Sequence, residues 1–261
     1  MDIQVRKPEQ VQSVQNKAHT WELWHRRFSH ISYDGLKYLH DAKLVEDFDV
    51  DEISPKPDCQ ACTEAKQSIK LFLVKAEHCS ERSRKLTHIN VWGKFPVTSI
   101  DGYQYFIAFV DDHSWYTTTE GLKNKSEVAQ KVKDYIMYLW NKGMIPEAIS
   151  FNEGGEFLVG ELQEWLKKNG ILAQLTVLYS PSQNSVVERM NHTLVELAHA
   201  MMNACTLRLF LWERTIQHTV YLWNRAYTKA LKETTPFQIW TGEKLSIKHL
   251  WEFRAPVGIL W

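Results

Sequence analysis

The feature that most constrains the fold of this chain is an ordered change of hydrophobic period between about residues 86 and 230. Three segments rich in aromatic and β-branched residues, THINVW, GYQYFIAFVDD and SWYTTTEGL, follow one another across short turns, as paired strands do. Helical and strand-like segments then alternate, the strands being IPEAISF and ILAQLTV. The order βββαβαβα predicts an α/β fold, a mixed sheet with helices on its faces.

The expected helices of this region carry end signals. Ser126 is expected to cap the first, which ends at Gly143 and turns Val128, Val132, Ile136 and Leu139 inward. ELQEWLKKNG forms the second and ends at Gly170. After a loop, YSPSQNS, a long helix runs to about Asn203, and a further helix spans about 210–230.

Composition bounds the class of protein and the compartment. With 44% hydrophobic and 24% charged residues among 261, the chain is expected to be soluble and globular, with no membrane span or signal peptide. Basic and acidic residues balance at 31 each, so any nucleic-acid binding depends on local patches. Residues 66–85 form one basic stretch, which could equally be a solvated linker. Four cysteines are too few for a disulfide framework and indicate a reducing intracellular compartment.

Two histidines and two cysteines near the N-terminus have the spacing of a metal site. His25 and His30 precede the C-x2-C pair Cys59 and Cys62, a ligand set that suits tetrahedral zinc. On an unbroken helix the histidines would point about 140° apart, so convergence requires a break, for which Ser29 is the candidate. The alternative is two surface histidines and an unrelated cysteine pair. Since all four positions would be filled by protein, the predicted zinc is structural.

Three further residues form the frame of a two-metal phosphoryl-transfer site. Asn90 lies in the first strand, Asn152 ends the fourth, and Glu188 lies near the start of the long helix. Such sites hold two Mg²⁺ ions with carboxylates that are distant in sequence. Here two of the three residues are amides, and each residue alone would be ordinary.

Several motifs together resemble one family. WHRRFSHISYDGLKYL, CQACTEAKQS, THINVWGKF, NEGGEF, YSPSQNSVVERMNHTLVELAHAMM and PFQIWTGEKLSIKHLW are similar, in this order over about residues 20–255, to the integrase region of copia-type retrotransposon polyproteins. The resemblance implies a zinc-binding pre-integrase segment before a ribonuclease H-like core. It also implies Mg²⁺- or Mn²⁺-dependent joining of element ends to target DNA, homo-oligomeric assembly on DNA, and residence in the nucleus.

The resemblance also implies domain boundaries. Residues 1–16 are expected to be a disordered N-terminus, 17–70 the zinc-binding domain, 71–205 the catalytic core and 206–261 a C-terminal helical extension. The zinc ligands all match the family pattern. Of the catalytic residues only Glu188 matches, because the family has aspartate at the positions of Asn90 and Asn152. Gln183 and Asn184 match in a loop that faces DNA in the family, although plain loop polarity would also explain them. With Lys66 and Arg189 they are the candidate DNA contacts.

The two amides predict a loss of catalysis. They reduce the formal charge of the frame from −3 to −1, and each lost carboxylate–Mg²⁺ contact costs several kcal/mol at an effective dielectric constant of ~20. The acids near enough to substitute are Asp111, Asp112, Glu153 and Glu156.

Three hypotheses about the function follow from these observations. The first is a mutationally decayed integrase, since both Asp-to-Asn departures can arise from single C-to-T changes. The second is an active integrase that uses substitute acids. The third is a domesticated, non-catalytic module that binds DNA or protein.

Overall fold

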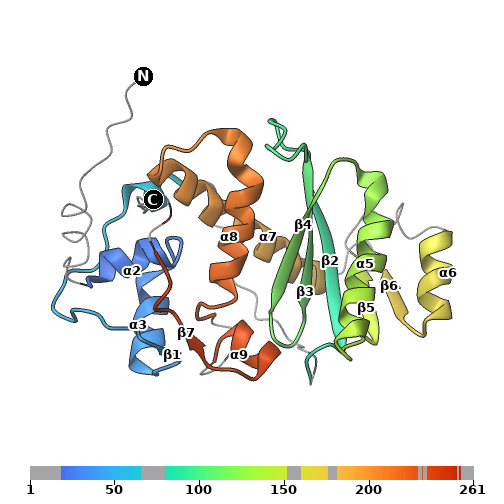
Figure 1. Cartoon of the computed structure of the whole chain (residues 1–261), viewed down its shortest axis with the longest axis horizontal. Helices are drawn as coiled ribbons and strands as arrows, with labels where there is room; N and C mark the ends of the chain where they lie inside the picture. The colour runs from blue at the N-terminus through green and yellow to red at the C-terminus, as the bar shows by residue number, and fades with distance from the viewer. Residues whose placement is uncertain are drawn as a thin grey trace, which may run out of the picture.

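The computed structural model describes residues 19–65, 80, 82–151, 160–175, 181–228, 231, 234–251 and 253, with the backbone alone described at 64, 65, 175 and 181–189. The expected disorder of residues 1–16 and two candidate site residues, Lys66 and Asn152, lie outside these ranges. Figure 1 shows a sheet with its helices in one half of the molecule and the N-terminal helices in the other.

A five-stranded mixed sheet forms the centre of the larger half, in the order β4-β3-β2-β5-β6. Both β2–β3 and β3–β4 are antiparallel, whereas β2–β5 and β5–β6 are parallel. The predicted α/β architecture and the predicted order of strands and helices along the chain are confirmed. The bounds are β2 Leu86–Gly93, β3 Tyr105–Asp111, β4 Thr117–Leu122, β5 Ala148–Phe151 and β6 Leu172–Leu175.

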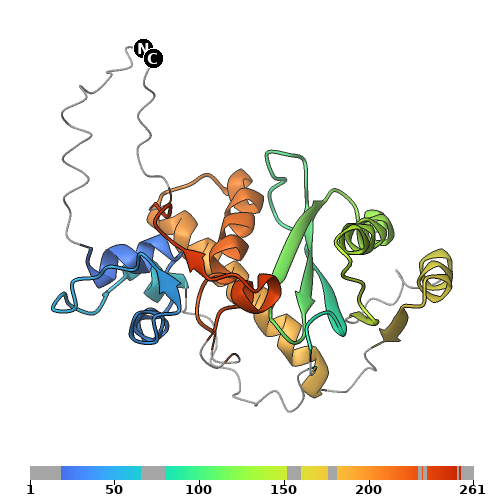
Figure 2. The ribbon, with the colours of Figure 1, turned by 60° about the horizontal axis from the view of Figure 1, so that its bottom comes forward.

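Helices cover both faces of the sheet because alternate strand residues point to opposite sides. On β3, Ile107 and Phe109 pack against α5 (Val128–Asn141) and α6 (Glu161–Lys168). The residues between them, Phe106, Ala108 and Val110, join the core formed with α7 (Pro181–Ala204) and α8 (Trp212–Trp223). In Figure 2, α5 and α7 lie on opposite sides of the strands.

Two helix starts differ from the expectation. A short 3₁₀ helix, η1 (Lys125–Glu127), precedes α5, so Ser126 is not its N-cap. The Glu127 carboxylate instead accepts a hydrogen bond from the backbone N–H of Lys123. The long helix α7 begins at Pro181, so five of the seven residues of the expected loop YSPSQNS are helical. Proline suits a first helical turn because its fixed φ is compatible and no N–H is needed there.

The expected stop of α5 is present. Gly143 has a φ of +68°, and its N–H donates to the carbonyl of Trp140. The next N–H, of Met144, reaches back to Leu139, which completes a Schellman-type end.

The N-terminal helices and the C-terminal residues share one core. The helices α2 (Trp21–Arg27) and α3 (Tyr33–Asp41) pack with Leu222, Ile247 and Leu250. β1 (Val45–Glu46) pairs in parallel with β7 (Leu245–Ser246). Such a short N-terminal segment could hardly build a core alone, and the C-terminal residues supply the missing apolar surface. The remaining elements are α4 (Gln60–Ala65), η3 (Leu209–Leu211) and α9 (Pro236–Thr241).

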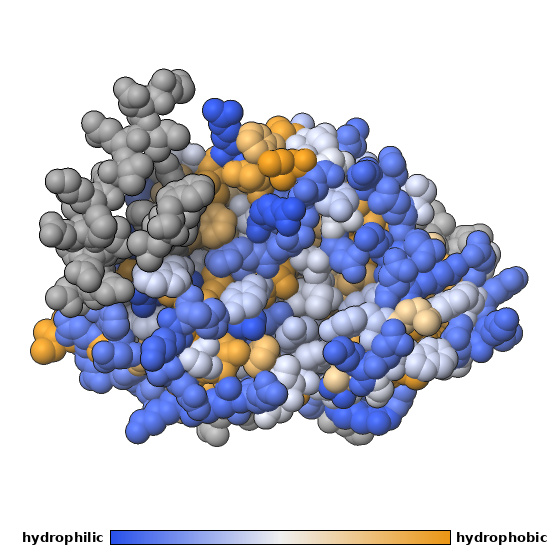
Figure 3. All heavy atoms as spheres, in the orientation of Figure 1, coloured by the Kyte–Doolittle hydropathy of each residue, from blue (hydrophilic) through white to orange (hydrophobic). Residues whose placement is uncertain are grey.

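The surface seen in Figure 3 is mainly hydrophilic, with apolar side chains in small groups. Among the helices of the described residues, none combines the length and the apolarity needed to cross a lipid bilayer.

Candidate metal centre and strand-transfer frame

The four expected metal ligands converge at one point. One nitrogen or sulfur atom from each of His25, His30, Cys59 and Cys62 lies within 4.8 Å of the others. Both histidines are buried, and both cysteines are half-buried. No other group of three or more His, Cys, Asp or Glu side chains in the described part of the chain is close enough to hold a metal ion.

The helix ends between the two histidines, as their convergence on one metal ion requires. Helix α2 ends at Arg27 with Phe28 as its C-cap, and both Ser29 (φ 48°) and His30 (φ 63°) adopt the left-handed conformation. The N–H of His30 still donates to the carbonyl of His25 at 2.7 Å, which closes the turn tightly. The two left-handed residues swing His30 back toward His25, so their ring centroids are 4.9 Å apart.

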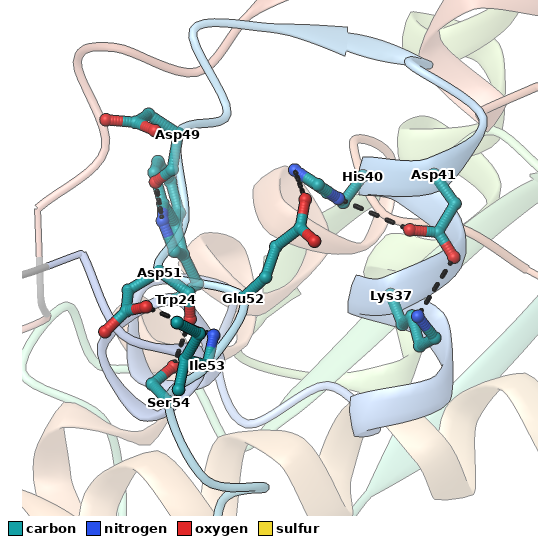
Figure 4. Close-up of polar contacts among 9 residues, drawn as sticks. All are labelled: Trp24, Lys37, His40, Asp41, Asp49, Asp51, Glu52, Ile53 and Ser54. Atoms are coloured by element: carbon teal, nitrogen blue, oxygen red, sulfur yellow. Dashed lines mark hydrogen bonds and ion pairs between the residues drawn. The ribbon is translucent and has the colours of Figure 1, made fainter.

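The cysteines are brought together by a helix start. Helix α4 begins at Gln60, directly after Cys59, and the N–H of Thr63 donates to the Cys59 carbonyl. Three residues apart at the beginning of one turn, the two sulfurs can reach the same ion. The segment before the cysteines, which contains Asp49 and Glu52, contacts the N-terminal helices. Trp24 donates from Nε1 to the Asp49 carbonyl, and His40 lies against Glu52, as Figure 4 shows.

The donor atoms lie close to the separations that a tetrahedral zinc ion requires. Metal–nitrogen and metal–sulfur bonds of about 2.0–2.1 and 2.3 Å imply tetrahedral edges of roughly 3.3–3.8 Å. Three separations are at or slightly below this range: 3.2 Å between the two ring nitrogens, 3.1 Å from His30 to Cys59 and 3.3 Å from His25 to Cys62. The Nδ1 of His25 lies 2.8 Å from the Ile31 carbonyl, to which it donates. This contact leaves the Nε2 atom of His25 available as the metal ligand. Histidines that bind metals usually donate their other ring N–H in this way.

One side of the cluster meets an open cavity of about 260 Å³. Its wall includes Tyr33, Asp34, Lys56 and Asp58 beside the two cysteines. The ammonium group of Lys56 lies 5.4 Å from the centre of the Tyr33 ring. A metal ion could therefore reach the cluster from solvent through this cavity without passing through the hydrophobic core.

Asn90 and Glu188 come from elements that meet on one face of the sheet. Asn90 is half-buried on β2 and pairs with Ala108, which faces α7. Two residues further along β2, the Trp92 ring lies 5.3 Å from that of His192, one helical turn after Glu188. Asn152 lies outside the described residues, but Phe151, the residue before it, pairs with Ile89 next to Asn90.

The two acids at the end of β3, Asp111 and Asp112, could replace the missing charges, but both carboxylates are hydrogen-bonded to other groups. Asp111 pairs with Thr87, on the face opposite Asn90, and its carboxylate accepts bonds from the N–H of Arg84 and from Ser114. Asp112 accepts from His88 at 2.9 Å and from the N–H of Ser80. Burial raises the pKa of Asp112, but these hydrogen bonds outweigh it and hold the pKa below its usual 3.8. Glu153 and Glu156 lie outside the described residues.

The candidate DNA contacts are placed only as far as the backbone of α7. Gln183 and Asn184 lie in its first turn rather than in a loop, and Arg189 lies two turns along. Helix starts carry unpaired N–H groups, so this position is compatible with phosphate contacts.

Two buried asparagines escaped the sequence analysis. Asn191, in the middle of α7, is fully buried, and neither the oxygen nor the nitrogen of its amide has a hydrogen-bond partner among the described residues. Asn224, at the end of α8, bonds both the N–H and the C=O of Thr117 on the outer edge of β4. An asparagine three residues after Glu188, within a helical apolar stripe, is a signal that could have identified the first.

Comparison with known proteins agrees with this geometry. Residues 1–67 match the GAG-pre-integrase domain. The chain is 30% identical over 233 residues, 88% of its length, to the retrovirus-related Pol polyprotein from transposon TNT 1-94 of Nicotiana tabacum. It is 26% identical over 227 residues, or 86%, to the corresponding polyprotein from transposon RE2 of Arabidopsis thaliana. The matches cover 17% and 15% of these relatives, so the chain spans about a sixth of their length.

The fold also has a counterpart among solved structures. A chain of the simian T-cell lymphotropic virus intasome, solved in complex with PP2A regulatory subunit B56 gamma, superimposes with a TM-score of 0.52 at 15% identity. The match covers 78% of this chain and 67% of that one, and it shows that the two share a fold. The domain match, the polyprotein relatives and this fold agree with one another and support a retrotransposon integrase of the Ty1/copia type.

Proposed function

We propose that this chain is a DNA-binding integrase derivative that has lost strand transfer. The observation that carries the proposal is the amide at Asn90, on the sheet face that α7 covers. In a two-metal mechanism, ions at this face activate the attacking oxygen and stabilise the leaving one. An amide still offers a carbonyl oxygen, but it lacks the charge that offsets dehydration of Mg²⁺.

The surroundings of Asn90 favour loss over substitution. Asp111 lies on the opposite sheet face, and Asp112 is committed to His88 and Ser80. Moving either carboxylate to the frame would break charge-assisted hydrogen bonds in a buried region, at about 1.5–3 kcal/mol each. An active site that uses these acids is therefore disfavoured.

The His/Cys cluster supports the retained part of the function. We infer that it holds a structural zinc ion, because two imidazoles and two cysteine sulfurs at tetrahedral separations suit Zn²⁺. When bound, the ion supplies folding free energy to a module that is small for its exposed surface. The N-terminal helices are held on the rest of the fold by the core that they share with Leu222, Ile247 and Leu250.

DNA binding would use the first turns of α7, where Gln183, Asn184 and Arg189 lie, with Lys66 as a further phosphate contact. Of the four candidate contacts only Arg189 and Lys66 are cationic, so we expect a shallow salt dependence of such binding. Assembly as a homo-oligomer on DNA and action in the nucleus belong to the same proposal.

The test measures DNA and metal affinity in one series of samples. Fluorescence anisotropy with a short DNA duplex should give binding that Glu188→Gln leaves unchanged and Arg189→Ala weakens. Mg²⁺ titration by calorimetry should give a much weaker affinity than the double variant Asn90→Asp, Asn152→Asp gives. Equal Mg²⁺ affinity of the two proteins would contradict the proposed loss, and absence of DNA binding would contradict the retained function.

A further inference from the structure

One helix, α7, lies between the metal cluster and the sheet. Helix α4, which follows Cys59 and contains Cys62, packs along α7. Ser29 lies between the two histidine ligands in the sequence. Its Oγ donates a hydrogen bond to the sulfur of Met201, on α7, at 3.3 Å. Both Ser29 and Met201 are buried. Figures 1 and 2 show α7 extending from the N-terminal helices to the strands in both views.

The same helix also packs on the sheet. Met190, Leu194, Ala198 and Met202, at helical spacing, form a core with Phe106, Ala108 and Val110 of β3. This packing involves no metal ligand and supports α7 whether or not a metal is bound. Elsewhere along α7, the Ser29–His30 turn contacts Met201 and α4 packs against the helix, and the geometry of these two elements depends on the metal ligands.

Neither of these elements is stable without support. Helix α4 has six residues, far fewer than the 12–15 needed for even a marginal isolated helix. The turn has two consecutive non-glycine residues with positive φ, each of which costs about 1–2 kcal/mol. An ion bound by His30 and by both cysteines would hold these two elements in place together.

We propose that metal occupancy of the His/Cys cluster controls the local stability of α7, the helix that carries Glu188 and three of the candidate DNA contacts. The proposal rests on the zinc site inferred above. Without the ion, α4 and the turn lose their common anchor, and α7 loses the packing that these two elements supply. Its amides then open more often while the sheet core stays intact. The module is thereby a positioning device for the helix of the strand-transfer frame.

Hydrogen exchange of the full chain, followed by mass spectrometry, tests this coupling. The protein is compared as purified with zinc, after removal of zinc with EDTA, and after zinc is restored, with zinc content measured on each sample. We expect exchange of amides within 190–204 to accelerate about tenfold on removal and to recover on restoration. Exchange within 128–141, helix α5 on the other sheet face, should change less than about twofold.

Two variants separate the metal from thiol loss in general. Cys59→Ser should exchange rapidly at 190–204 whatever the zinc concentration. Cys205→Ser should behave like the unmodified chain, because Cys205 lies outside the cluster and a serine hydroxyl can donate to the Phe253 carbonyl as the thiol does. A purified protein that binds no zinc overturns both the zinc site and the coupling. Zinc loss with unchanged exchange at 190–204, or with equal acceleration at 128–141, overturns the coupling alone.

Discussion

Replacement of Asn224 by leucine tests how the outer edge of the sheet is closed. The Asn224 amide acts as one more residue of backbone for β4, because its oxygen accepts from the Thr117 N–H at 2.8 Å and its nitrogen donates to the Thr117 carbonyl at 2.7 Å. Thr117 is fully buried, and Asn224 is 3% exposed. Leucine has a similar size but leaves both backbone groups of Thr117 without a partner.

The magnitude follows from these two groups. A buried polar group left unpaired costs about 1–3 kcal/mol, so two cost roughly 2–6 kcal/mol. Burial of the leucine methyl groups returns about 1–2 kcal/mol. We expect Asn224→Leu to lower the free energy of unfolding by about 2–4 kcal/mol, and Tm by on the order of 10 °C for a chain of this size.

Asn191 is the matched control, since the same substitution there should have the opposite sign. Its buried amide has no hydrogen-bond partner in the part of the chain that the structure describes, so Asn191→Leu should remove a desolvation cost of about 1–3 kcal/mol without breaking a described hydrogen bond. Urea denaturation followed by tryptophan fluorescence measures both variants against the unmodified chain. If Asn191→Leu destabilises as much as Asn224→Leu does, the account of the two amides is refuted.

Three further predictions concern charge and packing, and urea denaturation measures each of them. Because the folded pKa of Asp112 lies below 3.8, the stabilisation that it gains from His88 is present at neutral pH and is lost as pH falls through that folded pKa. Asp112→Asn should therefore destabilise by about 1–3 kcal/mol at pH 7 and have little effect once the pH is below the folded pKa; a pH-independent effect would contradict this. Burial, with Asp101 beside it, raises the pKa of Glu213 above 4.5, so Glu213→Gln should stabilise at pH 7, and the gain should vanish at lower pH, where the carboxyl is protonated in both states. Ile247→Ala should cost about 2–4 kcal/mol, because Ile247 is fully buried in the core shared with the N-terminal helices; a cost below 1 kcal/mol would show that the two ends pack independently.

The sheet and the metal cluster could be predicted from local patterns. Strands such as Tyr105–Asp111 are nearly continuous apolar runs, and α5 shows a clear helical stripe. The requirement for a break between His25 and His30 followed from helix geometry, and the left-handed residues lie at the position that it indicated. Periodicity and ligand chemistry are local properties, so they are visible in one sequence.

The features that escaped prediction depend on distant partners. β1 and β7 have two residues each and show no period, yet their pairing joins the two ends of the described chain. Ser126 has the residue type of an N-cap, but the bond from Lys123 to Glu127 set a 3₁₀ turn there instead. The role of Asn224 requires Thr117, 107 positions away, and no local signal predicts such a contact.

Strand transfer by the chain and by its revertant tests the central claim most directly. A duplex with the element's terminal sequence is incubated with target DNA and Mg²⁺ or Mn²⁺, using the chain as it stands, the double variant Asn90→Asp, Asn152→Asp, and that variant with Glu188→Gln added. Restored carboxylates should return several kcal/mol of metal binding, and each 1.4 kcal/mol felt by the transition state is tenfold in rate. The account predicts joined product from the double variant alone. Joined product from the unmodified chain that disappears with Glu188→Gln would contradict it.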